Sequence, residues 1–133
     1  MAGGRWNSTG VEIIYTAESR ALAMAEVAVH LTLATLPDDY FMLVIEVPDS
    51  FSCELLDENT LPDGWKQHPP LFTTQHIGDA FIYQQATCLL KVPSAVVKGD
   101  YNILINPHHP DFASIKILHS EPFPFDKRII SKF

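Results

Sequence analysis

The chain has 133 residues, of which 47% are hydrophobic and 19% are charged, and its formal net charge is −7. This length and composition are typical of one globular domain with its own core, so we expect a single domain over residues 1–133. The negative charge argues against direct binding of nucleic acid, which needs a basic surface, although one well-placed Arg can still hold a small anionic ligand.

Membrane and secretion signals are not evident in the sequence. No apolar run is long enough to cross a bilayer, and the first ten residues contain no apolar signal-peptide region. We therefore expect a cytoplasmic protein. Cys53 and Cys88 form no CxxC pair and have no His at metal-ligand spacing, which predicts two reduced thiols packed as small apolar side chains.

The first part of the chain predicts a strand, a helix and a second strand. Residues 11–15 are rich in β-branched and aromatic side chains, which is typical of a strand. Ser19 is a good N-cap for a helix over residues 20–31, which are rich in Ala and Leu and contain no Gly or Pro. After a turn at residues 36–39, the apolar run at residues 40–47 predicts a central, buried strand.

A short strand is expected next, at residues 52–56, and a turn at residues 61–65. Thr73 or Thr74 can cap a second helix that extends to about residue 85, although Gly78 weakens this pattern.

The last part of the chain predicts short strands. They are expected at residues 88–92, 101–105 and 112–118, with an extended segment at residues 123–126. The order of elements indicates an α+β fold, in which a mixed or antiparallel sheet is flanked by two or three helices.

Four polar side chains lie in or beside apolar segments, where an unpaired polar group is costly: Arg5, Tyr15, Glu26 and Ser94. A cation, an aromatic ring, a carboxylate and a hydroxyl are suited to binding and cleaving a dinucleotide. Arg5 follows two glycines and offers a planar fork for phosphate oxygens, while the ring of Tyr15 can stack on a base. The alternatives are a surface Arg near the terminus and a Tyr at the edge of the core.

Glu26 lies on the flank of a helical apolar face that contains Leu22 and Val29, so we expect its carboxylate at the edge of a cleft. The alternative is a structural role, in which the side chain turns to solvent or pairs with Arg20 or Lys91.

The remaining candidates lie near turns. Ser94 follows Pro93, and its hydroxyl can bind a ligand or its own backbone. Asn106 can likewise bind a ligand or cap a turn. His108 and His109 are adjacent, which is weak evidence for a metal site, so we expect no metal and keep a metal-dependent hydrolase as an alternative.

In this order the motifs resemble those of the RES-domain toxins of bacterial Xre–RES toxin–antitoxin systems. The family is named for an Arg, a Glu and a Ser, which match Arg5, Glu26 and Ser94. The matching segments are GGRWN (3–7), YTAES (15–19), AEVAVHL (25–31), LPDDY (36–40), GDA (78–80), VPSAVV (92–97), YN (101–102), NP (106–107), HPDF (109–112) and FD (125–126).

The resemblance implies a fold like the ADP-ribosyltransferase core and an enzyme that cleaves the nicotinamide–ribose bond of NAD⁺ without a metal. The acceptor would be water or phosphate, or a protein that becomes ADP-ribosylated. Glu26 would stabilise positive charge on the ribose, and Arg5 would hold the pyrophosphate. Tyr15 would stack on nicotinamide, while Ser94 and Asn106 would orient the ribose or the carboxamide.

The resemblance also implies a partner, an Xre-like antitoxin whose C-terminal domain covers the active site. Members of the family usually carry an additional segment before the Gly-Gly-Arg motif, whereas here Met1 and Ala2 lead directly to Gly3. An alternative to the active enzyme is therefore a catalytically impaired domain that serves as an antitoxin-binding module.

Overall fold

The computed structural model describes residues 3–30 and 40–123. These residues form an α+β fold, as predicted. The elements are β1 (Ile14–Ala17), α1 (Arg20–His30), β2 (Phe41–Glu46), β3 (Cys53–Leu55), the 3-10 helix η1 (Glu58–Thr60), α2 (Phe72–Gln84), β4 (Leu89–Pro93), β5 (Tyr101–Ile105), the 3-10 helix η2 (Pro110–Ser114) and β6 (Lys116–Pro122).

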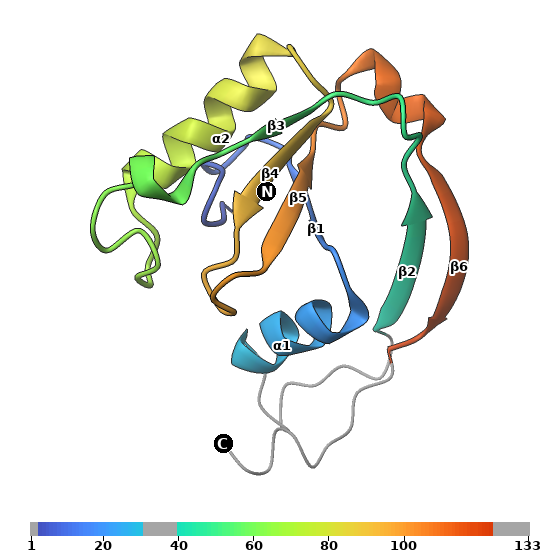
Figure 1. The fold of residues 1–133 in the computed structure, drawn as a ribbon, viewed down its shortest axis with the longest axis horizontal. Coiled ribbons are helices and arrows are strands. Elements are labelled where there is room, and N and C mark those ends of the chain that lie inside the picture. The colour runs from blue at the N-terminus through green and yellow to red at the C-terminus, as the bar shows by residue number, and fades with distance from the viewer. Residues whose placement is uncertain (1–2, 31–39, 124–133) are drawn as a thin grey trace.

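The strands in the described part of the chain form two sheets (Figure 1). The larger sheet has the order β1-β5-β4-β3, in which β3 runs parallel to β4 and the other neighbours are antiparallel. The smaller sheet is an antiparallel pair of β2 and β6, and Figure 1 shows it standing beside the larger one. The predicted mixed sheet is therefore present, together with a separate two-stranded ribbon.

The main core lies between the larger sheet and α2, which crosses one face of that sheet (Figure 1). Val92 of β4 and Leu104 of β5 are fully buried, and Phe81 and Ile82 of α2 pack in the same cluster. A side chain at Gly78 would place its Cβ 1.6 Å from the carbonyl oxygen of Trp6. The absence of that side chain lets α2 approach the N-terminal loop directly.

Helix α1 begins as the sequence predicts, because the Ser19 hydroxyl accepts a hydrogen bond from the backbone N–H of Leu22 at 3.1 Å. Leu22 is buried at 2% exposure, whereas Val29 is 63% exposed, so the packed apolar face is shorter than predicted. Figure 1 shows α1 at the end of the larger sheet where β4 ends and β5 begins. This position brings the helix to the site described below.

The prediction of a central, buried strand at residues 40–47 is wrong. β2 pairs only with β6 among the described strands, and its Phe41 and Leu43 are 59% and 50% exposed. A continuous apolar run is typical of a central strand, but the run does not specify which strands pair with it. Three of the six residues of β2 are exposed, so the strand is not buried on both faces.

Two other predicted elements are displaced. Helix α2 begins at Phe72, and its N-cap Leu71 makes no side-chain cap, so capping by Thr73 or Thr74 is wrong. The Thr74 hydroxyl instead donates to the carbonyl of Leu71 at 3.0 Å. The first strand begins at Ile14 rather than at residue 11.

The strand predicted at residues 112–118 is half wrong, because Pro110–Ser114 is a 3-10 helix and the strand begins at Lys116. Proline fits the first turn of a helix, which explains the start of η2. Cys53 is exposed on β3, so only Cys88 packs as a small apolar side chain, and both thiols are free. The predicted turn at residues 36–39 lies outside the described residues, as does all of the segment predicted at 123–126 except its first residue.

Candidate active site

A pocket of about 980 Å³ opens between the N-terminal loop, α1 and the β4–β5 connection. Arg5, Tyr15 and Glu26, three of the five candidate site residues from the sequence, line it together. Asn102, which the sequence offered only within the YN segment (101–102) and not as a site residue, lines it as well, and so does Lys66. Among the described residues, the pocket therefore combines the cations of Arg5 and Lys66 and the carboxylate of Glu26 with aromatic, imidazole and amide side chains.

Two hydrogen bonds fix the Glu26 carboxylate. Its Oε1 accepts from Nδ2 of Asn102 at 2.8 Å, and its Oε2 accepts from Oγ of Ser94 at 3.3 Å. The ion pairs considered from the sequence are not formed, because Lys91 Nζ lies 3.1 Å from Glu18 and Arg20 Nε lies 3.4 Å from Glu121. Two neutral donors thus orient Glu26, and among the described residues no cation forms an ion pair with it.

Ser94 lies behind Glu26 and is only 1% exposed. Besides donating to Glu26, its hydroxyl oxygen accepts hydrogen bonds from the backbone N–H groups of Val96 and Val97, both at 3.1 Å. The hydroxyl therefore closes the turn, which was the alternative considered from the sequence, and it also supports the Glu26 carboxylate. Ser94 is not among the residues that line the pocket.

Arg5 joins two distant parts of the chain. Its Nη1 donates to the carbonyl oxygens of Trp65 at 2.7 Å and Gln67 at 3.0 Å. Burial lowers the pKa of Arg5 from its ordinary value, and the nearby Tyr15 acts in the opposite direction. One nitrogen of the guanidinium thus holds the loop at residues 65–67, while the residue also lines the pocket.

Tyr15 holds the loop that carries Arg5. Its hydroxyl donates to Oδ1 of Asn7 and accepts from the backbone N–H of Trp6 at 3.1 Å. Burial of this hydroxyl raises the pKa of Tyr15. A Cβ at Gly4 would lie 2.7 Å from the tyrosine oxygen, so glycine permits this close approach. The residue is still 44% exposed, which leaves its ring available for stacking.

Helix α2 fixes the same loop from the other side. Nε2 of Gln75 donates to the carbonyl of Gly4 at 3.0 Å. The carboxylate of Asp79 accepts from both the backbone N–H and the hydroxyl of Ser8, the former at 2.9 Å. The residues on either side of Arg5 are therefore anchored to a rigid element, which limits where the guanidinium can lie.

Asn106, also a candidate from the sequence, is not brought to this pocket. It is fully buried at the opposite end of β5 from Asn102. Its Oδ1 accepts from the backbone N–H of His108 at 2.9 Å, and its Nδ2 donates to the carbonyl of Ile82 at 3.4 Å. The amide therefore caps a turn, which was the alternative considered from the sequence, and Asn102 is the asparagine that meets Glu26.

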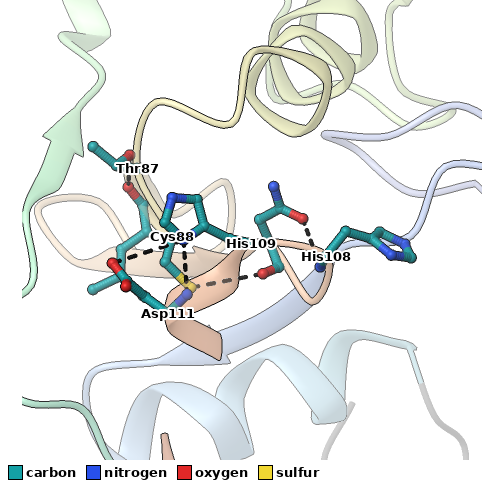
Figure 2. Close-up of polar contacts among 7 residues, drawn as sticks. Thr87, Cys88, His108, His109 and Asp111 are labelled. Atoms are coloured by element: carbon teal, nitrogen blue, oxygen red, sulfur yellow. Dashed lines mark hydrogen bonds and ion pairs between the residues drawn. The ribbon is translucent and has the colours of Figure 1, made fainter. Parts of the chain in front are cut away.

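The two adjacent histidines do not act as a pair. Figure 2 shows their rings pointing away from each other. Nε2 of His108 lies 3.4 Å from Glu12, whereas Nδ1 of His109 accepts from the backbone N–H of Asp111 at 3.1 Å. Within residues 3–30 and 40–123, no three His, Cys, Asp or Glu side chains gather in a way that could hold a metal ion. In that same part of the chain, no helix has the length and apolar character needed to span a membrane.

Known proteins resemble this chain over nearly its whole length. A family model described as "RES domain" matches residues 1–126. The chain belongs to the RES domain family. Three relatives match nearly the whole chain. The "Prs ADP-ribosylating toxin" of Sphingobium sp. (strain YBL2) is 42% identical over 134 residues, which cover 99% of this chain and 83% of the relative. The proteins named "Toxin Res" from Pseudomonas putida and Yersinia enterocolitica are 38% and 34% identical, and the matches cover 95% and 96% of this chain and 85% and 84% of theirs.

In this RES domain Arg5, Glu26 and Ser94 lie in one cluster but do not all reach the pocket. Arg5 and Glu26 line the pocket, and Ser94 supports Glu26 from behind. The structure adds Asn102 as the second donor to the carboxylate. A signal for Asn102 was present in the sequence, because it is a polar residue in a strand that is otherwise mostly apolar.

Proposed function

We propose that this RES domain is the toxin of a toxin–antitoxin pair, and that it binds NAD⁺ and cleaves the nicotinamide–ribose bond. One observation supports this most directly. The Glu26 carboxylate is held by Asn102 and Ser94 in a pocket that also contains Arg5 and Tyr15.

The chemistry requires a fixed negative charge. When the bond between the ribose carbon and the nicotinamide nitrogen breaks, its electron pair leaves with nicotinamide, which becomes neutral, and the ribose becomes oxocarbenium-like. A carboxylate placed beside that carbon stabilises the transition state more than the ground state. Glu26 is the carboxylate that lines the pocket and is suited to this role. Water then adds and loses a proton to give ADP-ribose, or phosphate adds to give the ribosyl phosphate.

The hydrogen bonds to Glu26 support catalysis by keeping the carboxylate in place. Both oxygens have a donor, so rotation of the carboxylate would break at least one hydrogen bond. Ser94 is itself fixed by the N–H groups of Val96 and Val97. A preorganised group needs no rearrangement at the moment of reaction, which is how an enzyme gains most from electrostatic stabilisation.

The other pocket residues suit the rest of the dinucleotide. Arg5 has guanidinium donors besides the nitrogen that binds Trp65 and Gln67, and a guanidinium matches the geometry of phosphate oxygens. The partly exposed ring of Tyr15 offers a face for nicotinamide. The amide oxygen of Asn102 can accept a hydrogen bond from a ribose hydroxyl, while its nitrogen holds Glu26.

Incubation with NAD⁺ and chromatography for free nicotinamide tests the proposal. Glu26→Gln should lower the rate about 10²- to 10³-fold while the circular dichroism spectrum and melting temperature stay near those of the wild type. Glu58→Gln is the matched control, because Glu58 is an exposed carboxylate in η1. If the wild-type protein releases no nicotinamide at high enzyme concentration, or if both variants behave alike, the proposed catalysis is wrong.

Transfer of ADP-ribose to a protein is a second candidate, and the name of the Sphingobium relative, an ADP-ribosylating toxin, favours it. The two reactions share the cleavage step and differ in the acceptor. Labelled NAD⁺ would give labelled protein in a cell lysate for protein transfer. Free ADP-ribose, or its phosphate adduct when phosphate is added, would indicate hydrolysis or phosphorolysis instead.

We further propose that the partner is an Xre-like antitoxin that covers the pocket. Val29 and Val96 line the pocket and are 63% and 37% exposed, so apolar surface is available to a protein partner. An antitoxin that binds there should block nicotinamide release and compete with NAD⁺. Tight binding that leaves the cleavage rate unchanged would contradict this placement.

A further inference from the structure

Two segments far apart in the chain repeat the same combination of residues. Arg5 precedes Trp6, and Lys66 follows Trp65, so each tryptophan has a cation beside it. Both tryptophans are buried, at 2% and 6% exposure, and their ring centroids lie 6.0 Å apart with the planes tilted by 42°. The core therefore holds the two backbone segments next to each other.

This packing places both cations at the pocket, which Arg5 and Lys66 line together. The segments are also joined directly, because Nη1 of Arg5 donates to the carbonyls of Trp65 and Gln67. Nζ of Lys66 lies 5.4 Å from the centre of the Trp65 ring, within the range of a cation–π contact. Lys66 is exposed. Its backbone is nevertheless restrained because Arg5 binds the carbonyls of both neighbouring residues, and its ammonium group is restrained by the Trp65 ring.

The charge of the chain makes this arrangement informative. The formal net charge is −7, and yet the described residues that line the pocket include the cations Arg5 and Lys66 and a single carboxylate, Glu26. Each phosphate of a pyrophosphate bears one negative charge, and Arg5 already uses one nitrogen to hold the loop at residues 65–67. A second cation supplies the missing charge and donors.

We propose that Lys66 acts with Arg5 to bind the pyrophosphate of the dinucleotide, so that Lys66 is a specificity-determining residue that selects dinucleotides over ligands without a pyrophosphate. This inference rests on the proposed function for its substrate class. The pocket volume of about 980 Å³ is at the upper end of the range for small-molecule sites, which suits a whole dinucleotide better than a nicotinamide riboside.

Calorimetric titration with ADP-ribose and with nicotinamide tests the inference without requiring turnover. Lys66→Gln should weaken ADP-ribose binding about five- to tenfold, as expected for loss of one charge-assisted contact at a partly exposed site, and leave nicotinamide binding unchanged. Lys66→Arg should stay within about twofold of the wild type, because it keeps the charge. Lys116→Gln, an exposed lysine at the start of β6, is the matched control and should bind both ligands normally.

Kinetics with NAD⁺ give a second readout, in which Lys66→Gln should raise KM by a similar factor and change kcat little. Equal ADP-ribose affinity in the wild type and Lys66→Gln overturns the inference, and so does a wild type that does not bind ADP-ribose. An equal loss of nicotinamide binding would also overturn it, since that indicates a general disturbance of the pocket. If ADP-ribose binding depends on Lys66 but no nicotinamide is released from NAD⁺, the role of Lys66 in binding the pyrophosphate is supported and the proposed catalysis is wrong.

Discussion

Replacing Gly78 by Ala is expected to destabilise this protein, although the same change inside most helices has the opposite effect. In an exposed helix interior, Ala is more favourable than Gly by about 1 kcal/mol. At position 78, however, the added Cβ would lie 1.6 Å from the carbonyl oxygen of Trp6 and 2.6 Å from its carbonyl carbon. Both atoms belong to the backbone, so no side-chain rotation can relieve the clash.

The size of the effect follows from the contacts that must separate. Real Cβ atoms essentially never approach closer than 3.0 Å, so α2 and the N-terminal loop would have to move apart by about 1.4 Å, which is 3.0 minus 1.6. That movement breaks the hydrogen bonds from Gln75 to Gly4 and from Ser8 to Asp79. Three such bonds contribute about 1 kcal/mol each, or more where the acceptor is a carboxylate. After subtracting the gain in helix propensity, we expect the free energy of unfolding to fall by about 3 kcal/mol.

Urea denaturation followed by tryptophan fluorescence measures the free energy of unfolding. Gly99→Ala is the control, because Gly99 has a φ of +90° but no atom within 4 Å of the added Cβ, so it should cost only about 1 kcal/mol through backbone strain. If Gly78→Ala is as stable as the wild type, or more stable, then the close approach of α2 to Trp6 is wrong. The anchoring of the Arg5 loop by α2 would fail with it.

Three further predictions concern the site and the thiols. Asn102→Ala should slow nicotinamide release about tenfold by removing one donor to Glu26, and an unchanged rate would refute its positioning role. Ellman's reagent should label Cys53 alone in the native protein and Cys88 only after unfolding; rapid labelling of both contradicts the burial of Cys88. Because the pKa of Tyr15 is raised, its contribution to stability is present below pH 10 and lost as the pH rises above that value. Tyr15→Phe should therefore reduce the alkaline loss of stability in urea titrations between pH 8 and 11, and an identical pH dependence would be inconsistent with this.

Elements with strong local signals were predicted closely. The start of α1 follows from Ser19, whose hydroxyl caps the helix, and the Ala-rich segment after it contains no competing signal. β5 spans Tyr101–Ile105, as its apolar pattern and the following Pro107 indicate. In these cases the information lies within a few residues of the element itself.

Errors arose where the outcome depends on distant partners. The apolar run of β2 predicted a strand but not its pairing with β6, which leaves Phe41 and Leu43 largely exposed. Gly78 was taken as a weakness of α2, whereas the structure shows that the contact with Trp6 requires it. Both features are set by segments 70 or more residues away in the chain.

The site was predicted only in part, because its assembly also depends on residues that are distant in the chain. Residue types identified Arg5 and Glu26, since a cation and a carboxylate beside apolar segments need partners or a use. An asparagine occurs near each end of β5, and the sequence does not show that the end with Asn102, rather than that with Asn106, meets α1. Lys66 had no signal at all, because an exposed lysine in an irregular segment looks like any other solvated residue.

The hydrogen bonds that assemble the pocket connect residues far apart in the order of synthesis. Arg5 and Trp65 are 60 residues apart, and Glu26 and Asn102 are 76 residues apart. During synthesis, a chain in which β5 has not yet emerged from the ribosome therefore lacks the Asn102 donor that orients Glu26. The pocket is a property of the completed fold, and a fragment truncated before β5 should be inert.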